Sequence, residues 1–320
     1  MSLALPWTAN LPYDVTGFGD LDGSGFLRVS WAELLLHAVT VGYGPRNRDA
    51  LASLETRVAI TRSSLRIQHD AWVARPSFFR LDSSEMSVAS FYLGMTQVSL
   101  TTASLLGLPA LTHVSTYMAE QGIRRTKGKR ADFVALSFSD GSSSVEALVE
   151  AKGRADETSV GAALAHAKDQ LKESTISAPV SVASVAFFNE RGEWAAIVND
   201  PPTEGNETPE PSEVAFSHYA PIVRAMLLTN QLLDPANDGR VSVAFPEFGL
   251  ELSLPAVLFR SIVSALNTGV TQIDPQVVVS AQQEEPSVRQ RELIGRGLYA
   301  LGGDMIGVEV DETLVVTDVQ

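Results

Sequence analysis

Cysteine is missing from this 320-residue sequence, so disulfide bonds and thiolate-based zinc sites are excluded. Long apolar runs are missing too, because no stretch approaches the roughly 18 residues that a membrane-spanning helix requires. The first residues also lack the basic segment followed by an apolar core that marks a signal peptide. We therefore expect a protein without membrane contacts, and the cytoplasm is its default compartment.

Positive charge is scarce in this chain. It carries 24 Lys and Arg against 38 Asp and Glu, which gives a formal net charge of −14. An acidic protein of this kind does not coat nucleic acid non-specifically, so any contact with a polynucleotide must be local. The dense basic cluster, here called the basic run, consists of Arg124, Arg125, Lys127, Lys129 and Arg130. We predict that the basic run binds nucleic acid.

Two familiar patterns for metal binding are incomplete. The five histidines are scattered, with no pair at ligand spacing, so we expect structural or surface roles for them. Asp20, Asp22 and Ser24 occupy the first ligand positions of an EF-hand loop, and Gly25 takes the position of its conserved turn. Position twelve, which needs a bidentate Glu, holds Trp31. A Gly-rich surface turn is therefore favoured over calcium binding.

Proline and acidic residues concentrate between Asp200 and Glu213. This segment holds four prolines and five acidic residues, which favours a linker. We predict an N-terminal accessory region at 1–84, mixed or β-rich, a core at 85–199, the linker at 200–213 and an α+β region at 214–320. The last region shows no chemical motif and is the candidate surface for a homodimer or a protein partner.

Hydrophobic periodicity predicts the elements on both sides of the core. They are a short helix or strand at Trp31–Val41, a hairpin in Thr56–Val73, a helix beyond Pro221 in Phe216–Leu233, strands in Arg240–Leu254, a helix at Val257–Leu266 and a hairpin in Gly307–Val319.

The core itself is predicted to have the element order α-β-β-β-α-β. Apolar residues at 3–4 spacing predict the helices, and β-branched alternation predicts the strands. The predicted elements are a helix at Ser87–Leu106, a strand near Thr112–Met118, hairpin strands at Asp132–Phe138 and Val145–Lys152 joined by a turn at 139–144 (Ser139-Asp140-Gly141 and three serines), a helix at Glu157–Ser174 and paired strands at Val180–Phe188 and Trp194–Val198.

The hairpin brings charged residues to one end of the sheet. Side chains alternate along a strand, so Glu150 and Lys152 share a face, and pairing sets Asp132 beside them. Two carboxylates are the ligands that Mg²⁺ prefers, with the carbonyl of Ala151 as a third ligand. Phosphodiester cleavage needs such a cation, and Lys152 would orient water or neutralise charge. Because the basic run lies next to this group in sequence, the pattern favours cleavage of nucleic acid.

Asp132 followed by Glu150-Ala151-Lys152 after a short hairpin resembles the PD-(D/E)xK nuclease superfamily, which has the restriction-endonuclease-like fold. The resemblance covers about 85–199, and Ala131 stands where the family has proline. It implies the catalytic residues Asp132, Glu150 and Lys152, with metal held by the two carboxylates and Ala151. It also implies accessory residues on the two flanking helices, for which the candidates are Glu85, Gln97, Lys168 and Gln170.

The sequence therefore predicts an α/β protein, a restriction-endonuclease-like core with a mixed central sheet flanked by helices and with additions at both ends. The favoured function is a Mg²⁺- or Mn²⁺-dependent nuclease, a hydrolase of nucleic-acid phosphodiesters, with DNA as the favoured substrate. The alternative is a catalytically inactive nuclease-fold protein that serves as a scaffold or binding module. A calcium-linked interaction protein that uses Asp20, Asp22 and Ser24 is a third class.

Overall fold

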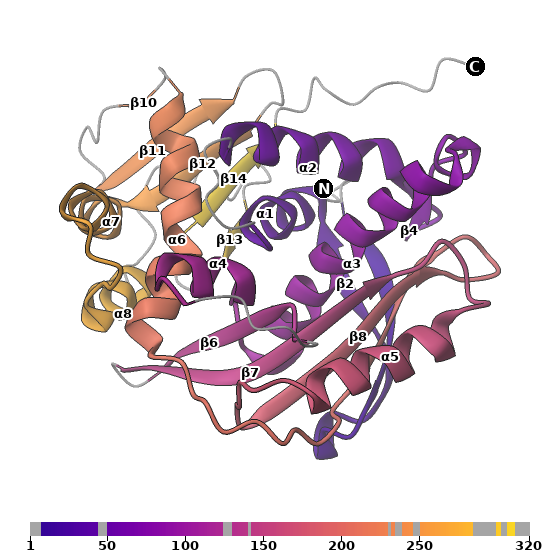
Figure 1. Cartoon of the computed structure of the whole chain (residues 1–320). Helices are drawn as coiled ribbons and strands as arrows, with labels where there is room; N and C mark the ends of the chain where they lie inside the picture. Colours follow the sequence, from indigo (N-terminus) through magenta and orange to yellow (C-terminus); the bar gives the residue numbers. More distant parts are fainter. Residues whose placement is uncertain are drawn as a thin grey trace.

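A mixed central sheet with helices on both faces organises this α/β protein, shown as a computed structural model in Figure 1. The structure describes residues 8–43, 50–123, 130–139, 142–229, 232–233, 239–245, 250–283, 299–301 and 306–310. The strands of the central sheet are β1 Thr8–Thr16, β2 Gly23–Ser30, β3 Leu65–Gln68, β4 Ala71–Ala74, β5 Ala110–His113, β6 Phe133–Ser139, β7 Ser142–Gly153, β8 Val180–Phe188 and β9 Trp194–Asn199.

Helices make up most of the remaining described chain. They are α1 Trp31–Thr40, α2 Ala50–Ser64, α3 Ser83–Leu106, α4 Val114–Glu120, α5 Val160–Lys172, α6 Pro211–Leu228, α7 Ala256–Thr268 and α8 Pro275–Gln283, with the 3-10 turns η1 Gly19–Leu21 and η2 Phe78–Arg80. Of the helices in these ranges, none combines the length and the apolarity that crossing a bilayer demands.

The strand order of the central sheet is β3-β4-β1-β9-β8-β7-β6-β5, with β2 paired to β1. Strands β5, β6 and β7 pair antiparallel in succession, and β7 then pairs parallel with β8 through the crossover helix α5. Along the chain this gives α3-β5-β6-β7-α5-β8, with the short helix α4 inserted after β5. The predicted succession of core elements is therefore present. The N-terminal strands extend the same sheet, because β1 pairs parallel with β9.

Alternation along β7 places two helices on opposite faces of the sheet. Ala147, Val149 and Ala151 are buried in the cluster that includes residues of α3. Leu148 is buried in the other large cluster, which includes Ala167 of α5. The period of two in strand β7 thus fixes which face each helix covers. One end of β7 therefore lies between α3 and α5.

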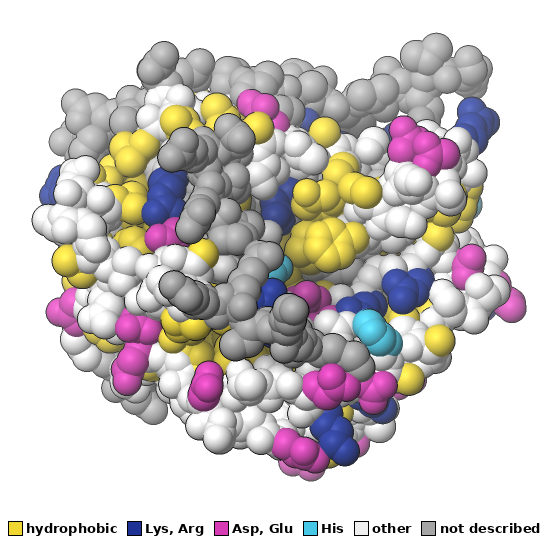
Figure 2. Space-filling view, in the orientation of Figure 1, with side chains coloured by type: hydrophobic (Ala, Val, Ile, Leu, Met, Phe, Trp, Pro, Cys, Tyr) yellow, Lys and Arg dark blue, Asp and Glu magenta, His cyan; other side chains and the backbone are white. Residues whose placement is uncertain are grey.

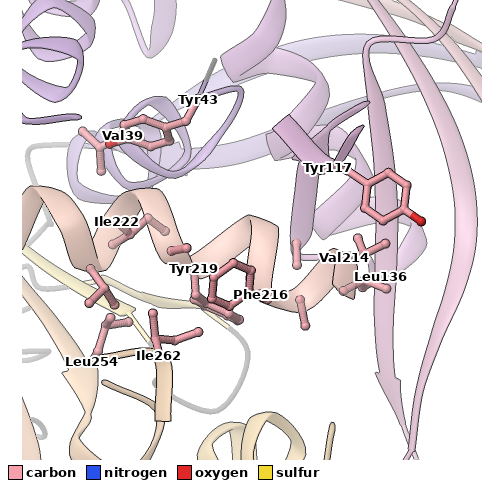
Figure 3. Packing of buried hydrophobic residues seen from close by; sticks show 14 of the residues in the cluster. Val39, Tyr43, Tyr117, Leu136, Val214, Phe216, Tyr219, Ile222, Leu254 and Ile262 are labelled. Atoms are coloured by element: carbon pink, nitrogen blue, oxygen red, sulfur yellow. The ribbon is translucent and has the colours of Figure 1, made fainter. Parts of the chain in front are cut away.

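A second sheet, in the C-terminal region, has the order β10-β11-β12-β14-β13. Its strands are β10 Leu232–Leu233, β11 Arg240–Phe245, β12 Leu250–Pro255, β13 Tyr299–Leu301 and β14 Ile306–Val310. Helix α6 joins it to the central sheet, since its residues Phe216, Tyr219 and Ile222 belong to one cluster with Leu136 of β6 and Leu254 of β12 (Figure 3). The described part of 214–320 therefore shares a hydrophobic core with the central sheet.

The predicted linker contains no helix or strand from 200 to 210, but it is fixed to the loop after α5. The N–H of Ser177 donates to the carbonyl of Glu207 at 2.8 Å, and Asn206 donates to Thr175 at 3.1 Å. A Cβ on Gly205 would lie 2.2 Å from the carbonyl oxygen of Ile176, so only glycine permits this approach. The segment is an extended strap along the core.

Two predicted elements are wrong in part. The strand near Thr112–Met118 ends at His113, whose Nδ1 accepts from the N–H of Ser115 at 3.1 Å and so caps α4. The first half of the hairpin predicted in Thr56–Val73 belongs to helix α2, which ends at Ser64, and the second half contains β3 and most of β4. Buried side chains at 54, 58 and 61 have helical spacing, which outweighed the short local alternation.

The predicted start of the C-terminal helix beyond Pro221 is also wrong, because α6 begins at Pro211 and continues through Pro221. An internal proline removes one helix hydrogen bond and crowds the preceding turn. Nearly every side chain from Val214 to Met226 is buried, and this packing offsets the cost. Trp31–Val41 is a helix, and the remaining predicted strands and helix at 240–268 are present. Of the hairpin predicted in Gly307–Val319, 311–319 lies outside the described residues.

Candidate active site at the end of the β6–β7 hairpin

The register of the hairpin brings the predicted acidic residues together. Phe133 pairs with Val149, so Asp132, one residue before β6, comes opposite Glu150. Glu150 and Lys152 lie on the face of β7 that α5 covers, as their spacing of two predicts. Asp140 and Gly141 of the predicted turn lie outside the described residues. The three serines predicted to follow them in the turn, 142–144, instead belong to β7 and pair with 137–139 of β6.

Glu150 is a fully buried carboxylate, with 0% of the residue exposed. Its Oε1 accepts a hydrogen bond from the ammonium of Lys152, whose side chain is 16% exposed. Its Oε2 is buried and finds no hydrogen-bond partner in the part of the chain that the structure describes. A buried oxygen left unpaired costs free energy, on the order of 1–3 kcal/mol or more for a charged group. Oε2 thus lacks the positive partner that Oε1 has in Lys152.

The pKa of Glu150 reflects this environment. Burial and the nearby Asp132 carboxylate raise the pKa of Glu150 from its ordinary 4.5 to about 8, and Lys152 opposes the shift only in part. Two adjacent carboxylates are both hydrogen-bond acceptors, so they are compatible only when a proton or a cation lies between them. The electrostatics of the pair therefore favour a bound proton or a bound metal ion.

Asp132 is oriented by the backbone of the neighbouring strand. Its Oδ2 accepts from the N–H of Ala151 at 3.1 Å. The N–H and C=O of one strand residue point to the same side, so the carbonyl of Ala151 also points toward Asp132 rather than toward β8. The carboxylates of Asp132 and Glu150 and the backbone of Ala151 thus lie at the same end of the β6–β7 hairpin.

Gln170 on α5 completes the network, as one of the accessory candidates. Its Oε1 accepts from Nζ of Lys152 at 2.6 Å, and its Nε2 donates to the backbone carbonyl of Arg130 at 3.2 Å. One side chain therefore ties the ammonium of Lys152 to the segment that leads into Asp132. Lys168 lies two residues away on the same helix, roughly 200° around its axis, and faces a different direction.

The other two accessory candidates, Glu85 and Gln97, make hydrogen bonds to other residues. Glu85 is in the first turn of α3, where it forms a capping box with Asp82. Gln97 is buried, and its Oε1 accepts from the hydroxyl of Ser184 at 2.9 Å. Ser184 pairs with Ala151 and shares its face of the sheet, which is the face opposite Glu150. The structure therefore places Gln97 on the face opposite the carboxylate pair, and Glu85 in the N-terminal cap of α3.

Of the basic run, the structure describes only Arg130. Arg124, Arg125, Lys127 and Lys129 lie outside the described residues. Arg130 is half-buried; its guanidinium contacts the sulfur of Met118 at 3.4 Å, and its carbonyl bonds Gln170. The C-terminal end of the basic run is therefore held at the edge of the candidate site.

The half EF-hand at Asp20–Gly25 forms the turn of the β1–β2 hairpin. The carboxylate of Asp22 accepts from the N–H of Phe18 at 2.6 Å, and the hydroxyl of Ser24 donates to Asp14 at 2.9 Å. These side chains are used within the turn. Across the described ranges no group of three or more His, Asp or Glu side chains is arranged to hold a metal. The candidate site contains only two such side chains, Asp132 and Glu150, and its third oxygen would come from a backbone carbonyl.

Two glycines that position the site were not singled out in the sequence. A Cβ on Gly153 would lie 1.7 Å from the carbonyl oxygen of Ser90, and a Cβ on Gly94 would lie 2.8 Å from that of Lys152. Backbone-to-backbone contact thus presses α3 onto the end of β7. A glycine inside a helical pattern is the signal that would have indicated this close approach.

Comparison of the chain with family models, with curated proteins and with solved structures finds no match. The case for the site therefore depends on its own geometry: a buried, half-partnered carboxylate beside a second carboxylate, an ammonium and a backbone carbonyl.

Proposed function

We propose that this protein is a metal-dependent nuclease of the PD-(D/E)xK type, with a restriction-endonuclease-like core and DNA as its favoured substrate. The observation that carries the proposal is the unpartnered, buried Oε2 of Glu150 beside Asp132. The strand order β5-β6-β7-β8, with an antiparallel hairpin followed by a parallel crossover, supports the same family.

The donor set fits a hard divalent cation such as Mg²⁺ or Mn²⁺. Asp132, Glu150 and the carbonyl of Ala151 offer oxygen ligands only, and their charge calls for a cation. When bound, the ion would supply a water of lowered pKa and neutralise developing negative charge. A cation between the carboxylates would also remove the cost of the buried Oε2.

The protein's own side chains have separate roles in this proposal. The N–H of Ala151 orients Asp132. Lys152 holds Oε1 of Glu150, and its ammonium is the charge next to the reacting phosphodiester. Gln170 restricts Lys152 and joins it to Arg130, at the end of the basic run that would hold the phosphate backbone.

The direct test is cleavage by the wild-type chain. Supercoiled plasmid, linear single-stranded DNA, linear duplex and RNA are incubated with Mg²⁺, with Mn²⁺ and with EDTA. We expect metal-dependent products that EDTA abolishes, together with a rise in melting temperature on adding Mg²⁺ or Mn²⁺, since a ligand that binds only the native state stabilises it. Failure to cut any of these substrates with either metal would overturn the nuclease proposal.

A contribution of the basic run is tested by salt dependence. Replacing Arg124, Arg125 and Lys127 together with Ala should weaken DNA binding and flatten the plot of log affinity against log salt concentration, because each phosphate contact releases counterions. An unchanged slope would show that DNA enters by another route.

One observation favours the alternative, a nuclease fold that acts as a scaffold. Lys152, Glu150 and Gln170 form a connected network that already provides one positive charge. In a scaffold, Glu150→Ala would lower the melting temperature, since it breaks a buried pair, and no substrate would be cut. In the nuclease, the same change relieves repulsion with Asp132, and the melting temperature stays equal or rises.

A further inference from the structure

The N-terminal half of α3 carries an exposed apolar patch formed by Val88 and Phe91, here called the Val88–Phe91 patch. Val88 is 51% exposed and Phe91 is 46% exposed. They are three residues apart, so they lie on one face of the helix. Figure 2 shows hydrophobic side chains gathered over α3, with acidic and basic side chains beside them toward α5. About half of each residue is thus available to a partner.

The ring of Phe91 is supported from one side. It meets Tyr92 edge-on, with ring centroids 5.7 Å apart and planes at 69°. Tyr92 in turn packs against the guanidinium of Arg57, which lies 5.2 Å from its ring centroid. A ring fixed in this way loses little conformational entropy when a flat ligand covers its open side.

The patch and the candidate site lie at the same end of β7, with α3 on one face of the sheet and Glu150 and Lys152 on the other. Gly153 touches the carbonyl of Ser90, the residue just before Phe91. Glu150 lies three residues back along β7, a distance of about 10 Å along a strand. The patch and the carboxylate pair therefore belong to the same end of the sheet.

Two cations lie at this end of β7. Lys152 is in the site, and the half-buried Arg154, at the exit of β7, donates from its guanidinium to the carbonyl of Gly153 at 2.7 Å. An aromatic platform beside positive charge is the combination that binds single-stranded nucleic acid, with the base on the ring and the phosphates on the cations.

We propose that Phe91 is a stacking platform for an unpaired nucleobase close to the phosphodiester held at Glu150 and Lys152. This rests on the proposed function and specifies its substrate class as single-stranded DNA. In a duplex each base is covered on both faces by its neighbours, so a ring on the protein stacks only on a base that is out of the helix. Val88 extends the apolar surface under the base.

Binding is tested in EDTA, so that no strand is cut. A labelled twelve-nucleotide thymidine strand carrying one 2-aminopurine is titrated with protein, and its duplex is titrated in parallel. Wild type should prefer the single strand. Phe91→Ala should weaken single-strand binding about 5- to 150-fold, which corresponds to roughly 1–3 kcal/mol for one stacked base. Phe91→Trp should retain the affinity and the 2-aminopurine signal, whereas Phe91→Leu should lose both.

Phe26→Ala is the matched control, because Phe26 is 69% exposed on β2, away from β7 in the strand order. It should bind as wild type does. Equal single-strand affinity for wild type and Phe91→Ala overturns the platform, as does an equal loss on duplex. Melting temperatures of all variants show whether each is folded.

The platform and the nuclease fail in distinguishable ways. If wild type binds the single strand with a 2-aminopurine response but cuts nothing with Mg²⁺ or Mn²⁺, the stacking platform is supported and the nuclease proposal is overturned. If wild type and Phe91→Ala cut single-stranded DNA at the same rate, the nuclease proposal is supported and the stacking platform is overturned. We expect wild type to cut and Phe91→Ala to cut single strands at least 5-fold more slowly at low substrate concentration.

Discussion

Two buried charges in this protein are treated in opposite ways. Arg57 of α2 is buried, and its guanidinium donates to backbone carbonyls at the end of α1, with Gly42 at 2.6 Å and Val41 also accepting. Its flat faces meet the rings of Tyr43 and Tyr92. Glu150 has a donor on one oxygen only.

The two side chains differ in how completely the protein pairs them. Arg57 satisfies carbonyls that the end of a helix leaves without a partner, so the protein uses its charge internally. The pKa of Arg57 is lowered by burial, while the two tyrosines oppose that shift. Glu150, by contrast, keeps an acceptor that only a proton or an added cation can satisfy. Incomplete pairing, together with a second carboxylate nearby, is therefore what distinguishes Glu150 from Arg57.

The comparison predicts its largest effect at Glu150. Glu150→Gln should reduce Mg²⁺-dependent cleavage by about 1,000-fold, because the metal and its water lose their position while the shape of the side chain is kept. The melting temperature should stay equal or rise. Rates on plasmid and melting curves, measured on one preparation, check both.

Glu146→Gln is the control for this change. Glu146 lies on the same strand, is half-exposed and bonds the hydroxyl of Ser144 at 2.5 Å. It should cut at the wild-type rate. Full activity of Glu150→Gln, or a large fall in its melting temperature, would place Glu150 in the same structural class as Arg57.

Arg57 should show the converse behaviour. Arg57→Ala leaves the carbonyls of Val41 and Gly42 without a buried donor, so the free energy of unfolding should fall by about 3 kcal/mol. Arg57→Lys restores the charge but not the forked geometry and should recover only part of the loss. Denaturant unfolding measures both. A neutral Arg57→Ala would remove the distinction drawn between the two charges.

Much of the fold was predictable, because strands β6 to β9 and helices α3 and α5 have strong periodic patterns. For Glu150 and Lys152 the alternation predicts the shared face, and the pairing of β6 with β7 places Asp132 opposite Glu150. Local signals also failed where tertiary packing decided the outcome. Pro221 lies inside a buried helix, against its intrinsic preference.

What the sequence could not provide is the partner of each side chain. Gln170 and Lys168 were equal candidates on one helix, and only the docking of α5 on β7 selects Gln170. Gln97 has a side-chain amide like that of Gln170, but it packs on the face of the sheet opposite Glu150. The burial of Glu150, on which its pKa depends, requires the helices that cover it, and these come from distant parts of the chain.

A pH series sharpens the comparison further. Native Glu150 keeps its proton up to a pKa of about 8, whereas the unfolded chain releases it near the ordinary 4.5. Below pH 4.5 both states are protonated, and between the two values ionisation favours the unfolded state. Wild type should therefore lose stability relative to Glu150→Gln as pH rises from 4.5 to 8, by 1 kcal/mol or more, and the difference should level off above pH 8.

Saturating Mg²⁺ at pH 8 should cancel that difference by stabilising wild type alone. Unfolding free energies at five pH values, with and without Mg²⁺, check the prediction. A difference that shrinks as pH rises would mean that Glu150 is ionised and well paired in the native state.

The smallest effect is expected at Gln170. Gln170→Ala removes an acceptor from Lys152 and a donor from the carbonyl of Arg130, both at hydrogen-bond distance. Lys152 retains its bond to Glu150, so the ammonium stays in the site but is less restricted. Loss of a supporting partner of this kind typically costs 10- to 100-fold in activity, and we expect about 10-fold in kcat with a stability loss near 1 kcal/mol. Lys168→Ala, on a different face of α5, should change neither.

The pH profile of kcat separates positioning from simple packing. If Gln170 holds Lys152 against Glu150, its removal weakens the one interaction that lowers the pKa of Glu150, so the rising limb of the profile should move to higher pH. Gln170→Met fills the space without hydrogen bonds and should show the same shift. A profile that keeps its shape while the melting temperature falls would assign Gln170 to packing alone, and Lys152 would then be positioned by Glu150 and the strand itself.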